Sequence, residues 1–353
     1  MLKGSDFMTK IPPKPVRIVV AGCGSMSHAW ISYALARDDC RIVGLVDPNP
    51  EALSQISRQY GLSEAMRGSD LSEVIRKTNA NLVFCLAVPS AHDDIAMTAF
   101  CENCAVMSEK PLAENMTQAH KMIAAAKEKN LFFAVMQNRR YLRQIRSCRA
   151  LIEKGLIGQP GYMGADFFLG PHFGGFREFM DSPLLLDMAI HTFDQARFLL
   201  NAKATSVYCH EFNPPGSWYQ GNAAAVSIFT MDDGTVFCYR GSWCAIGCET
   251  SWESEWRITG SRGTLRWDGH GMPWVEILPQ EEASADPEKA SFVHIDGPEV
   301  WHGREGHEGC LDALFSALFS GQPAETQAED NQYSLAMVMG AIESSRTGQK
   351  IQL

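Results

Sequence analysis

The chain has 353 residues, a hydrophobic content of 45% and a formal net charge of −10 at pH 7. This length exceeds what one hydrophobic core usually organises, so we expect two domains. Nucleic acids and anionic membrane surfaces attract clustered Lys and Arg, so the negative charge argues against both as partners. A small-molecule partner fits this composition better.

The N-terminal segment lacks the apolar run of a signal peptide, and no stretch approaches the length of a membrane span. Met8 offers an alternative start, which would make residues 1–7 an extension. The 11 cysteines are an odd number scattered along the chain, which is typical of a reducing compartment. We therefore expect a cytoplasmic protein. No metal is expected, because the pairs Cys101/Cys104 and Cys244/Cys248 lack the spacing of a zinc site.

The first part of the chain alternates apolar strand patterns with helical patterns, which predicts a doubly wound parallel sheet over residues 14–137. The expected strands are Val16–Ala21, Arg41–Val46, Asn81–Leu86, Cys104–Met107 and Leu131–Met136. The expected helices are Met26–Arg37, Glu51–Tyr60, Leu71–Lys77, Ala91–Phe100 and Thr117–Lys129. This alternation is the pattern of a Rossmann domain.

A glycine turn follows the first predicted strand in the sequence VRIVVAGCGSMS, residues 16–27. Gly22 allows the backbone to turn tightly, and Gly24 lets a pyrophosphate approach the free N–H groups of the next helix. Ser27 stands where the third glycine of the dinucleotide fingerprint usually lies. A structural glycine turn with no ligand remains the alternative interpretation.

Asp47 ends the second predicted strand, roughly 20 residues beyond the glycine turn. Its carboxylate is placed to accept hydrogen bonds from ribose hydroxyls and to repel a 2′-phosphate. No Arg or Lys follows it closely, so the sequence favours NAD, although it leaves NADP open.

Lys110 lies in the sequence Ser108-Glu109-Lys110-Pro111, directly after the strand predicted at 104–107. Ligands of such sheets bind outside the carboxyl ends of the strands, so Lys110 is at the right edge. The proline keeps Lys110 out of helical angles, permits a cis peptide and lets the turn fix the ammonium group. The alternative is a surface lysine before a turn proline.

The second part, residues 138–353, is expected to be an α+β domain with a large, mostly antiparallel sheet. A helix is predicted at Tyr141–Lys154, with later helices near Gly309–Ser320 and Gln332–Ser345. The expected strands are Thr205–Phe212, Ala223–Met231, Thr235–Trp243 and Glu253–Thr259.

A helix is also predicted over Leu184–Leu200, where Asp187 and His191 would share one face with Asp194 a turn further on. A histidine titrates near neutrality and suits proton transfer from an alcohol, and a carboxylate one turn away can orient it. A surface ion pair on this helix is the alternative interpretation.

Taken together, the glycine turn, Asp47, the E-K-P tripeptide and the D-x-x-x-H helix resemble the glucose–fructose oxidoreductase / inositol dehydrogenase / rhizopine-catabolism (Gfo/Idh/MocA) family. The match spans nearly the whole chain. It also includes Val88-Pro89-Ser90 with His92, the run at residues 137–141 and the closing helix ending at residues 341–343.

The resemblance implies a catalytic role for Lys110, with Asp187 and His191 as the carboxylate and the acid/base. It also implies a homodimer or homotetramer assembled through the second sheet. The expected cofactor-binding residues are Gly22, Gly24, Ser25, Met26, Asp47, Pro89, His92, Glu109 and Lys110. Three departures from the family pattern affect the site: Ser27 replaces a glycine, Ala189 stands at a usual glycine position, and Asp181-Ser182-Pro183 replaces a glycine-rich lead into the D-x-x-x-H helix.

The sequence therefore predicts an NAD-dependent dehydrogenase acting on a secondary hydroxyl of a sugar, sugar acid or inositol-like polyol. His191 and Lys110 would handle the hydroxyl proton as hydride moves to the nicotinamide. Two alternatives are a transient-redox glycosidase or lyase, and a nicotinamide-binding regulator without turnover.

Four residues are candidates for substrate contact, namely Asn138, Arg139, His172 and Arg177. The last two lie in a glycine-rich loop, where solvent exposure is an equal alternative. Seven of the eight tryptophans lie beyond residue 200 and could stack on sugar rings, although core packing explains most of them. His302 and His307 fit a polar turn before a helix.

Overall fold

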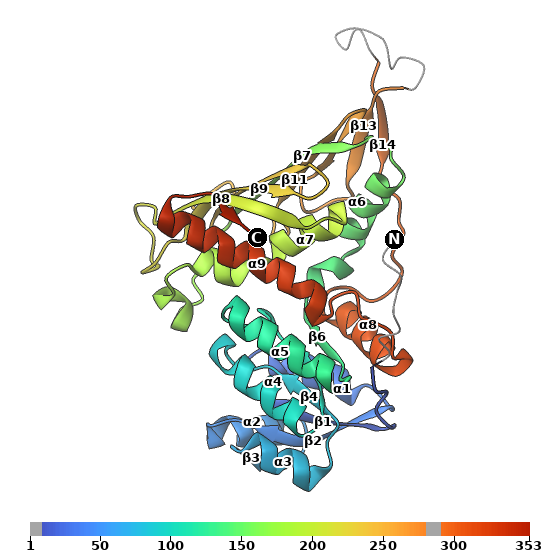
Figure 1. Cartoon of the computed structure of the whole chain (residues 1–353), viewed down its shortest axis with the longest axis vertical. Coiled ribbons are helices and arrows are strands. Elements are labelled where there is room, and N and C mark those ends of the chain that lie inside the picture. Colours follow the sequence, from blue (N-terminus) through green and yellow to red (C-terminus); the bar gives the residue numbers. More distant parts are fainter. Residues whose placement is uncertain (1–8, 280–290) are drawn as a thin grey trace. The chain divides into compact units, whose positions relative to one another are not determined.

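The computed structural model describes residues 9–279 and 291–353. The alternative start at Met8 and the segment before it lie outside the described residues. The chain divides into two compact units. Unit 1 contains the chain up to Asn138 together with Arg304–Leu335, and unit 2 contains Arg139–Gly303 together with Ala336–Leu353 (Figure 1).

Unit 1 contains a parallel sheet of six strands in the order β3-β2-β1-β4-β5-β6, which confirms the predicted doubly wound arrangement. The strands are β1 (Val16–Ala21), β2 (Cys40–Val46), β3 (Met66–Gly68), β4 (Leu82–Cys85), β5 (Ala105–Ser108) and β6 (Phe133–Val135). Strands β1, β4 and β5 are almost wholly buried, as strands with helices on both faces must be. The sequence analysis missed β3, which is only three residues long.

Helices alternate with these strands, and polar caps begin several of them. The helices of unit 1 are α1 (Ser27–Leu35), α2 (Pro50–Gln59), α3 (Leu71–Thr78), α4 (His92–Cys101), α5 (Met116–Glu128) and α8 (Gly306–Ser320). The side chains of Asn49, Asp70 and Asn115 accept backbone N–H groups at the starts of α2, α3 and α5. Such caps satisfy donors that a helix leaves unpaired.

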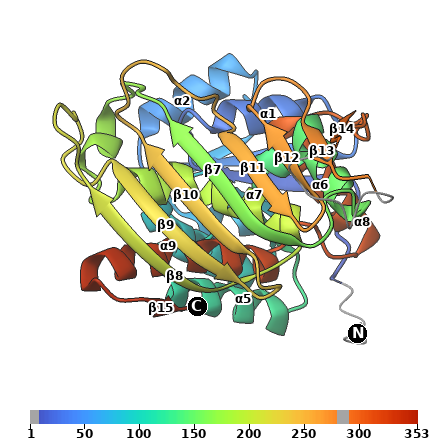
Figure 2. The same ribbon diagram turned by 90° about the horizontal axis from the view of Figure 1, so that it is seen from above.

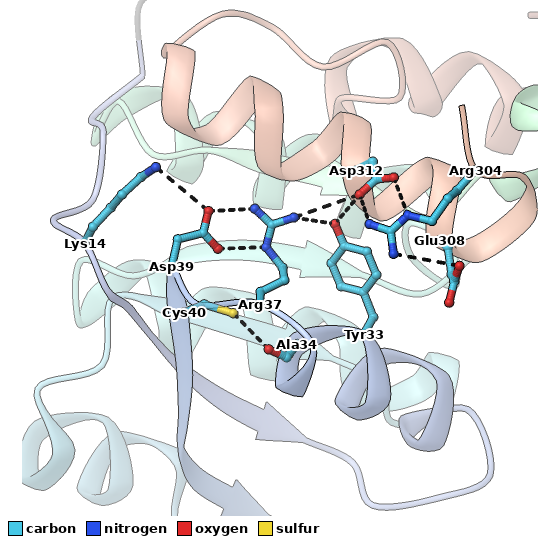
Figure 3. Close-up of polar contacts among 9 residues, drawn as sticks. All are labelled: Lys14, Tyr33, Ala34, Arg37, Asp39, Cys40, Arg304, Glu308 and Asp312. Atoms are coloured by element: carbon cyan, nitrogen blue, oxygen red, sulfur yellow. Dashed lines mark hydrogen bonds and ion pairs between the residues drawn. The ribbon is translucent and has the colours of Figure 1, made fainter. Parts of the chain in front are cut away.

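Helix α8 belongs to unit 1 although the sequence analysis places it in the second predicted domain range. Figure 3 shows the polar contacts that attach it to α1. The hydroxyl of Tyr33 donates to Asp312 Oδ1 at 2.7 Å, and Arg304 Nε donates to Asp312 Oδ2 at 2.7 Å. Beside them, Phe315 packs edge-on against Phe84 of β4 with 6.3 Å between ring centroids. A segment far along the sequence thus completes the core of the first unit.

Unit 2 contains a nine-stranded sheet in the order β14-β13-β12-β11-β7-β10-β9-β8-β15. Its strands are β7 (Pro160–Phe168), β8 (Ala204–Phe212), β9 (Ala224–Met231), β10 (Val236–Ser242), β11 (Glu255–Gly260), β12 (Gly263–Trp267), β13 (Trp274–Ile277), β14 (Val293–Asp296) and β15 (Ile351–Gln352). Among the described strands of this sheet only β7 and β10 pair in parallel, so the prediction of a mostly antiparallel sheet is confirmed.

Helices cover one face of this sheet. Figure 2 shows that the described helices of the unit leave the opposite face uncovered. The covering helices are α6 (Arg143–Glu153), α7 (Ile190–Leu200) and the part of α9 (Ala328–Thr347) that belongs to unit 2. Phe193 of α7 packs edge-on against Phe229 and Tyr239, with ring centroids 4.8 and 5.2 Å apart. The core of the unit lies between these layers.

Glu211 of β8 is a buried carboxylate on the helix-covered side, with 7% of its surface exposed. The hydroxyl of Ser182 donates to its Oε2 at 3.2 Å. Burial, partly offset by this hydrogen bond, raises the pKa of Glu211 from 4.5 to about 7. The folded chain therefore binds more protons than the unfolded chain between these two values, and folding stability falls as the pH rises through this window.

We predict that Glu211→Gln raises the free energy of unfolding by about 2–3 kcal/mol at pH 8 and by little at pH 4, where the native carboxyl is already protonated. Urea unfolding followed by tryptophan fluorescence at both pH values measures the difference. The exposed Glu255 of β11 supplies the control substitution to Gln. Equal effects of Glu211→Gln at the two pH values would contradict the prediction.

Candidate functional site

The turn after β1 brings two backbone segments into direct contact. Gly22 has φ = +103°, and a Cβ atom there would lie 2.5 Å from the backbone nitrogen of Ala87. Its N–H donates to the carbonyl of Val46 at 2.9 Å. Glycine is required here on both counts, because an L side chain is strained at this φ and has no space.

The three residues just before α1 are exposed and leave an open approach to the helix N-terminus. A Cβ at Gly24 would meet nothing within 4 Å, and Ser25 and Met26 are exposed as well. Ser27, at the position of the usual third glycine, is buried and begins α1, and both its N–H and its hydroxyl donate to the carbonyl of Gly24. Open space in front of backbone N–H groups suits a pyrophosphate, so these residues fit a dinucleotide.

Asp47 lies at the carboxyl end of β2 and holds the glycine turn. Its Oδ2 accepts from the backbone N–H of Cys23, and its Oδ1 accepts from the N–H of Asn49, both at 2.8 Å. Carboxylate oxygens carry additional lone pairs, so ribose hydroxyls can still donate to this group. Burial, together with this nearby carboxylate, raises the pKa of the Cys23 thiol to about 12.

The turn that carries Lys110 follows β5, and the residues beside Lys110 fix it. Glu109 is buried, and its Oε1 accepts from Trp30 Nε1 of α1 at 2.8 Å. The Lys110–Pro111 peptide is cis. The Lys110 N–H donates to Glu109 Oε2 at 3.3 Å. This geometry places a lysine beside the carboxyl edge of the parallel sheet, at the end of a constrained turn.

His92 is the first residue of α4, and its ring contacts both the loop after β4 and the loop after β5. Its Nδ1 lies 2.8 Å from the carbonyl oxygen of Pro111, and its Nε2 lies 3.1 Å from that of Ala87. The ring is buried, and burial lowers its pKa despite these two carbonyl contacts. Pro89, also expected at the cofactor, lies in the 3-10 turn Pro89–Ala91 just before it.

His307 is a polar residue that the sequence analysis set aside. It lies in the first turn of α8, with Nε2 4.0 Å from Glu109 Oε1 and Nδ1 3.4 Å from the side-chain nitrogen of Asn138. Asn138 was expected near the substrate. No spacing in the sequence signals this cluster, because it joins segments about 170 residues apart.

Unit 2 carries the second group of expected residues, at the start of α7. The prediction of a single α-helix over residues 184–200 is wrong. A turn of π-helix spans Leu184–Ala189, and α7 begins at Ile190. Asp187 lies in the π turn, and His191 lies in the first α turn with 8% of its surface exposed. Because a π turn closes its hydrogen bond from residue i to i+5, residues four apart still lie about one turn apart, and the expected shared face of Asp187 and His191 stays a prediction.

A buried ion pair holds α7 one turn beyond His191. Asp194, expected on the motif face, accepts from Arg140 Nε and Nη2, both at 2.7 Å, and Arg197 lies 3.7 Å from it. All three side chains are almost fully buried. A bidentate guanidinium pair constrains geometry closely, so it fixes the helix that carries His191.

Arg139, expected near the substrate, is buried inside unit 2. Its Nη1 lies 3.4 Å from Glu253 Oε2 and donates to the carbonyl of Trp252. Burial lowers its pKa. Glu253 also accepts from Gln195 of α7 at 3.2 Å, so Arg139 and Gln195 converge on one carboxylate.

His172 and Arg177, the two loop candidates, contact different residues of unit 2. The His172 ring stacks on Trp218 with 3.6 Å between centroids. Arg177 Nε donates to Asp187 Oδ2 at 2.6 Å. Arg177 is therefore in direct contact with a residue of the D-x-x-x-H motif, which sequence spacing alone does not indicate.

Residues 9–279 and 291–353 contain no cluster of three or more His, Cys, Asp or Glu side chains able to hold a metal ion. Within the same residues, no helix has both the length and the apolar character needed to cross a membrane.

A six-stranded parallel sheet with a glycine turn at β1 and an acidic residue after β2 defines a dinucleotide-binding protein. Family models agree: residues 16–137 match the oxidoreductase family with an NAD-binding Rossmann fold, and residues 145–266 match the GFO/IDH/MocA C-terminal domain. The chain belongs to the GFO/IDH/MocA oxidoreductase family.

Two similar proteins extend over nearly the whole chain. D-apiose dehydrogenase of Rhizobium rhizogenes is 24% identical over 94% of this chain and 96% of its own. Myo-inositol 2-dehydrogenase of Thermotoga maritima is 24% identical over 96% and 98%. Among solved structures, an oxidoreductase from Agrobacterium radiobacter in complex with NAD+, L-tartaric acid and magnesium covers 96% of this chain and 98% of its own, with a TM-score of 0.81 and 20% identity.

Proposed function

We propose that the protein is an NAD-dependent dehydrogenase that oxidises a secondary hydroxyl of a sugar, sugar acid or inositol-like polyol. The observation that carries this proposal is the constrained turn of Lys110 at the carboxyl edge of a dinucleotide-binding sheet, in a chain that also carries Asp187 and His191. The names of the two relatives, a sugar dehydrogenase and an inositol dehydrogenase, support the substrate class.

The cofactor is held, in this proposal, by the loops at the carboxyl edge of the first sheet. Gly22, Gly24, Ser25 and Met26 would face the pyrophosphate at the start of α1. Asp47 would accept from the ribose, and the residues Pro89, His92, Glu109 and Lys110 would border the nicotinamide end. The nicotinamide, when bound, supplies an acceptor for hydride.

The protein's own residues then manage the proton of the substrate hydroxyl. His191, as a neutral imidazole, accepts this proton, which gives it the charge of an imidazolium. Lys110 donates a hydrogen bond to the same oxygen and stabilises the negative charge that develops there. Asp187 orients the substrate or the imidazole. In the reverse direction, His191 and Lys110 return the proton to a carbonyl oxygen.

We predict that the purified protein reduces NAD, seen as absorbance at the reduced-nicotinamide band, with a member of a panel of aldoses, polyols, inositols and sugar acids. Lys110→Ala and His191→Ala should each lower kcat by about 100-fold or more, because each removes a group that acts on the reacting oxygen. Cofactor affinity should stay nearly unchanged in His191→Ala.

An unchanged rate in His191→Ala would remove this residue as the acid/base. If the whole panel gives no reduced cofactor although NAD binds, the dehydrogenase proposal fails. Turnover of a glycoside without net reduced cofactor would then identify transient-redox cleavage, and cofactor binding without any turnover would identify a regulator.

A second prediction tests the cofactor. Asp47 also holds the N–H of Cys23, so Asp47→Ala would disturb the glycine turn itself. Asp47→Asn is the sharper variant, because it removes the negative charge and keeps one acceptor oxygen for the Cys23 N–H, at the cost of the acceptor for the Asn49 N–H. We expect Asp47→Asn to weaken NAD binding by about 10-fold and to strengthen NADP binding, since a 2′-phosphate is no longer repelled. Equal changes in the two dissociation constants would contradict the assignment.

We also propose that the uncovered face of the second sheet pairs with a second copy of the chain. Large apolar side chains are exposed there: Tyr162, Tyr208, Phe212, Val226, Ile228 and Val236. An exposed apolar surface on a sheet is typical of a subunit interface. The proposed enzyme would thus be a homodimer or homotetramer, and we place it in the reducing cytoplasm.

Ile228→Arg, at the middle of β9, should reduce the mass measured by light scattering after size-exclusion chromatography, because it buries a charge in the interface. Met272→Arg, a similarly exposed residue outside these strands, is the matched control. A monomeric wild type, or an Ile228→Arg variant with unchanged mass, would overturn the proposed interface.

A further inference from the structure

Arg177 occupies an unusual position for a loop arginine. It lies in a short 3-10 turn, Gly175–Phe179, that begins after Gly174. Its side chain is 32% exposed, and Asp187, its ion-pair partner, is 12% exposed. The pair therefore lies at the boundary between protein and solvent, with the Arg177 side chain about one third exposed.

The hydrogen bond to Asp187 uses only part of the guanidinium. Nε donates to Asp187 Oδ2, whereas the two terminal amino groups donate no hydrogen bond to any residue in the described part of the chain. A guanidinium presents two edges that match a carboxylate, one through Nε and one through the terminal amino groups. The terminal edge of Arg177 thus remains available for a second anion.

Charge balance near the π turn favours an acidic ligand. The Asp187 carboxylate alone would repel a substrate carboxylate close to it. Arg177 offsets this charge at a distance of 2.6 Å, and its terminal amino groups add further donors. A neutral polyol gains less from this arrangement, because hydrogen bonds between charged partners are about twice as strong as neutral ones.

Aromatic surfaces flank the same guanidinium. Its Cζ lies 5.6 Å from the ring centroid of Phe173 and 4.8 Å from that of Phe176. Phe173 in turn lies 6.0 Å from Trp252, and these three aromatic side chains are 41–56% exposed. Exposed ring faces can pack against the C–H face of a cyclic sugar, and they lower the local dielectric around the cation.

We propose that Arg177 makes this enzyme selective for a sugar acid, with its terminal amino groups binding the substrate carboxylate while Phe173, Phe176 and Trp252 contact the ring. This inference rests on the proposed dehydrogenase function and narrows it to carboxylate-bearing substrates. Arg177 is a specificity-determining residue here, and the proton steps stay with His191 and Lys110.

The test compares substrates that differ only in the carboxylate: glucuronate with glucose, galacturonate with galactose, and gluconate with glucitol. Each pair is assayed with NAD, and kcat and KM are determined separately. The wild type should favour at least one acid over its neutral counterpart by roughly 10-fold or more in kcat/KM. Arg177→Gln should lower kcat/KM for that acid by roughly 100-fold, mainly through KM, and leave the neutral counterpart within a few-fold.

Two further variants separate recognition from folding. Arg177→Lys keeps the charge but loses the fork of donors, so it should restore part of the activity on the acid. Arg346→Gln removes a guanidinium from a surface ion pair with Glu343 in α9. This control should leave kcat/KM unchanged for both the acid and the neutral substrate. Equal losses on acid and neutral substrate in Arg177→Gln would show that Arg177 only supports Asp187, and the inference would fail.

Binding gives a second measurement that does not need turnover. Quenching of tryptophan fluorescence, to which Trp252 contributes, is titrated with glucuronate and with glucose in the presence of NAD. Saturable binding of the acid that is lost in Arg177→Gln supports the inference even where the acid is not oxidised. Oxidation of neutral sugars alone, with no binding of any acid, would overturn the inference while the proposed dehydrogenase stands. If no compound is oxidised and no acid binds, both fail.

Discussion

The close approach of Gly22 to the backbone of Ala87 is the constraint on which the rest of the first unit's site depends. A side chain at residue 22 would separate the turn after β1 from the turn after β4. From Ala87 a series of contacts continues: His92 lies against the carbonyls of Ala87 and Pro111, and Glu109 accepts from Trp30 of α1. Because α1 begins directly after the glycine turn, these contacts form a closed ring that fixes both the helix N-terminus and the turn of Lys110.

The second unit follows a different principle, in which buried charge pairs position a helix. Asp194 is held by Arg140, and Glu253 is held by Arg139 and Gln195, so α7 is fixed through the two residues that lie one turn beyond His191. Removing one partner would leave a buried charge uncompensated, which costs several kcal/mol. These ion pairs explain why Arg139 and Arg140, two adjacent charged residues, are both buried.

The regular elements were largely predictable, because their signals are local. The expected and observed bounds of β1 coincide, and most other expected strands and helices differ by no more than three residues at either end. Strand β7 was missed because its Pro160, Gly161 and Gly164 weaken the strand pattern, and long-range pairing with β10 and β11 forms it. The π turn before α7 was also missed, since a run of apolar residues is read as α-helix.

The sequence by itself determined the class of the protein and the residues of its motifs, because a phosphate-binding turn, a strand-ending acid and an E-K-P turn each lie within a few adjacent residues. Only the tertiary structure decided which side chains meet. It brought His307 to Glu109, enclosed Asp194 with Arg140 and placed Arg177 on Asp187. These contacts join residues 10 to about 200 positions apart, and no local propensity specifies them. They arise when packing removes water and each buried polar group must find a partner.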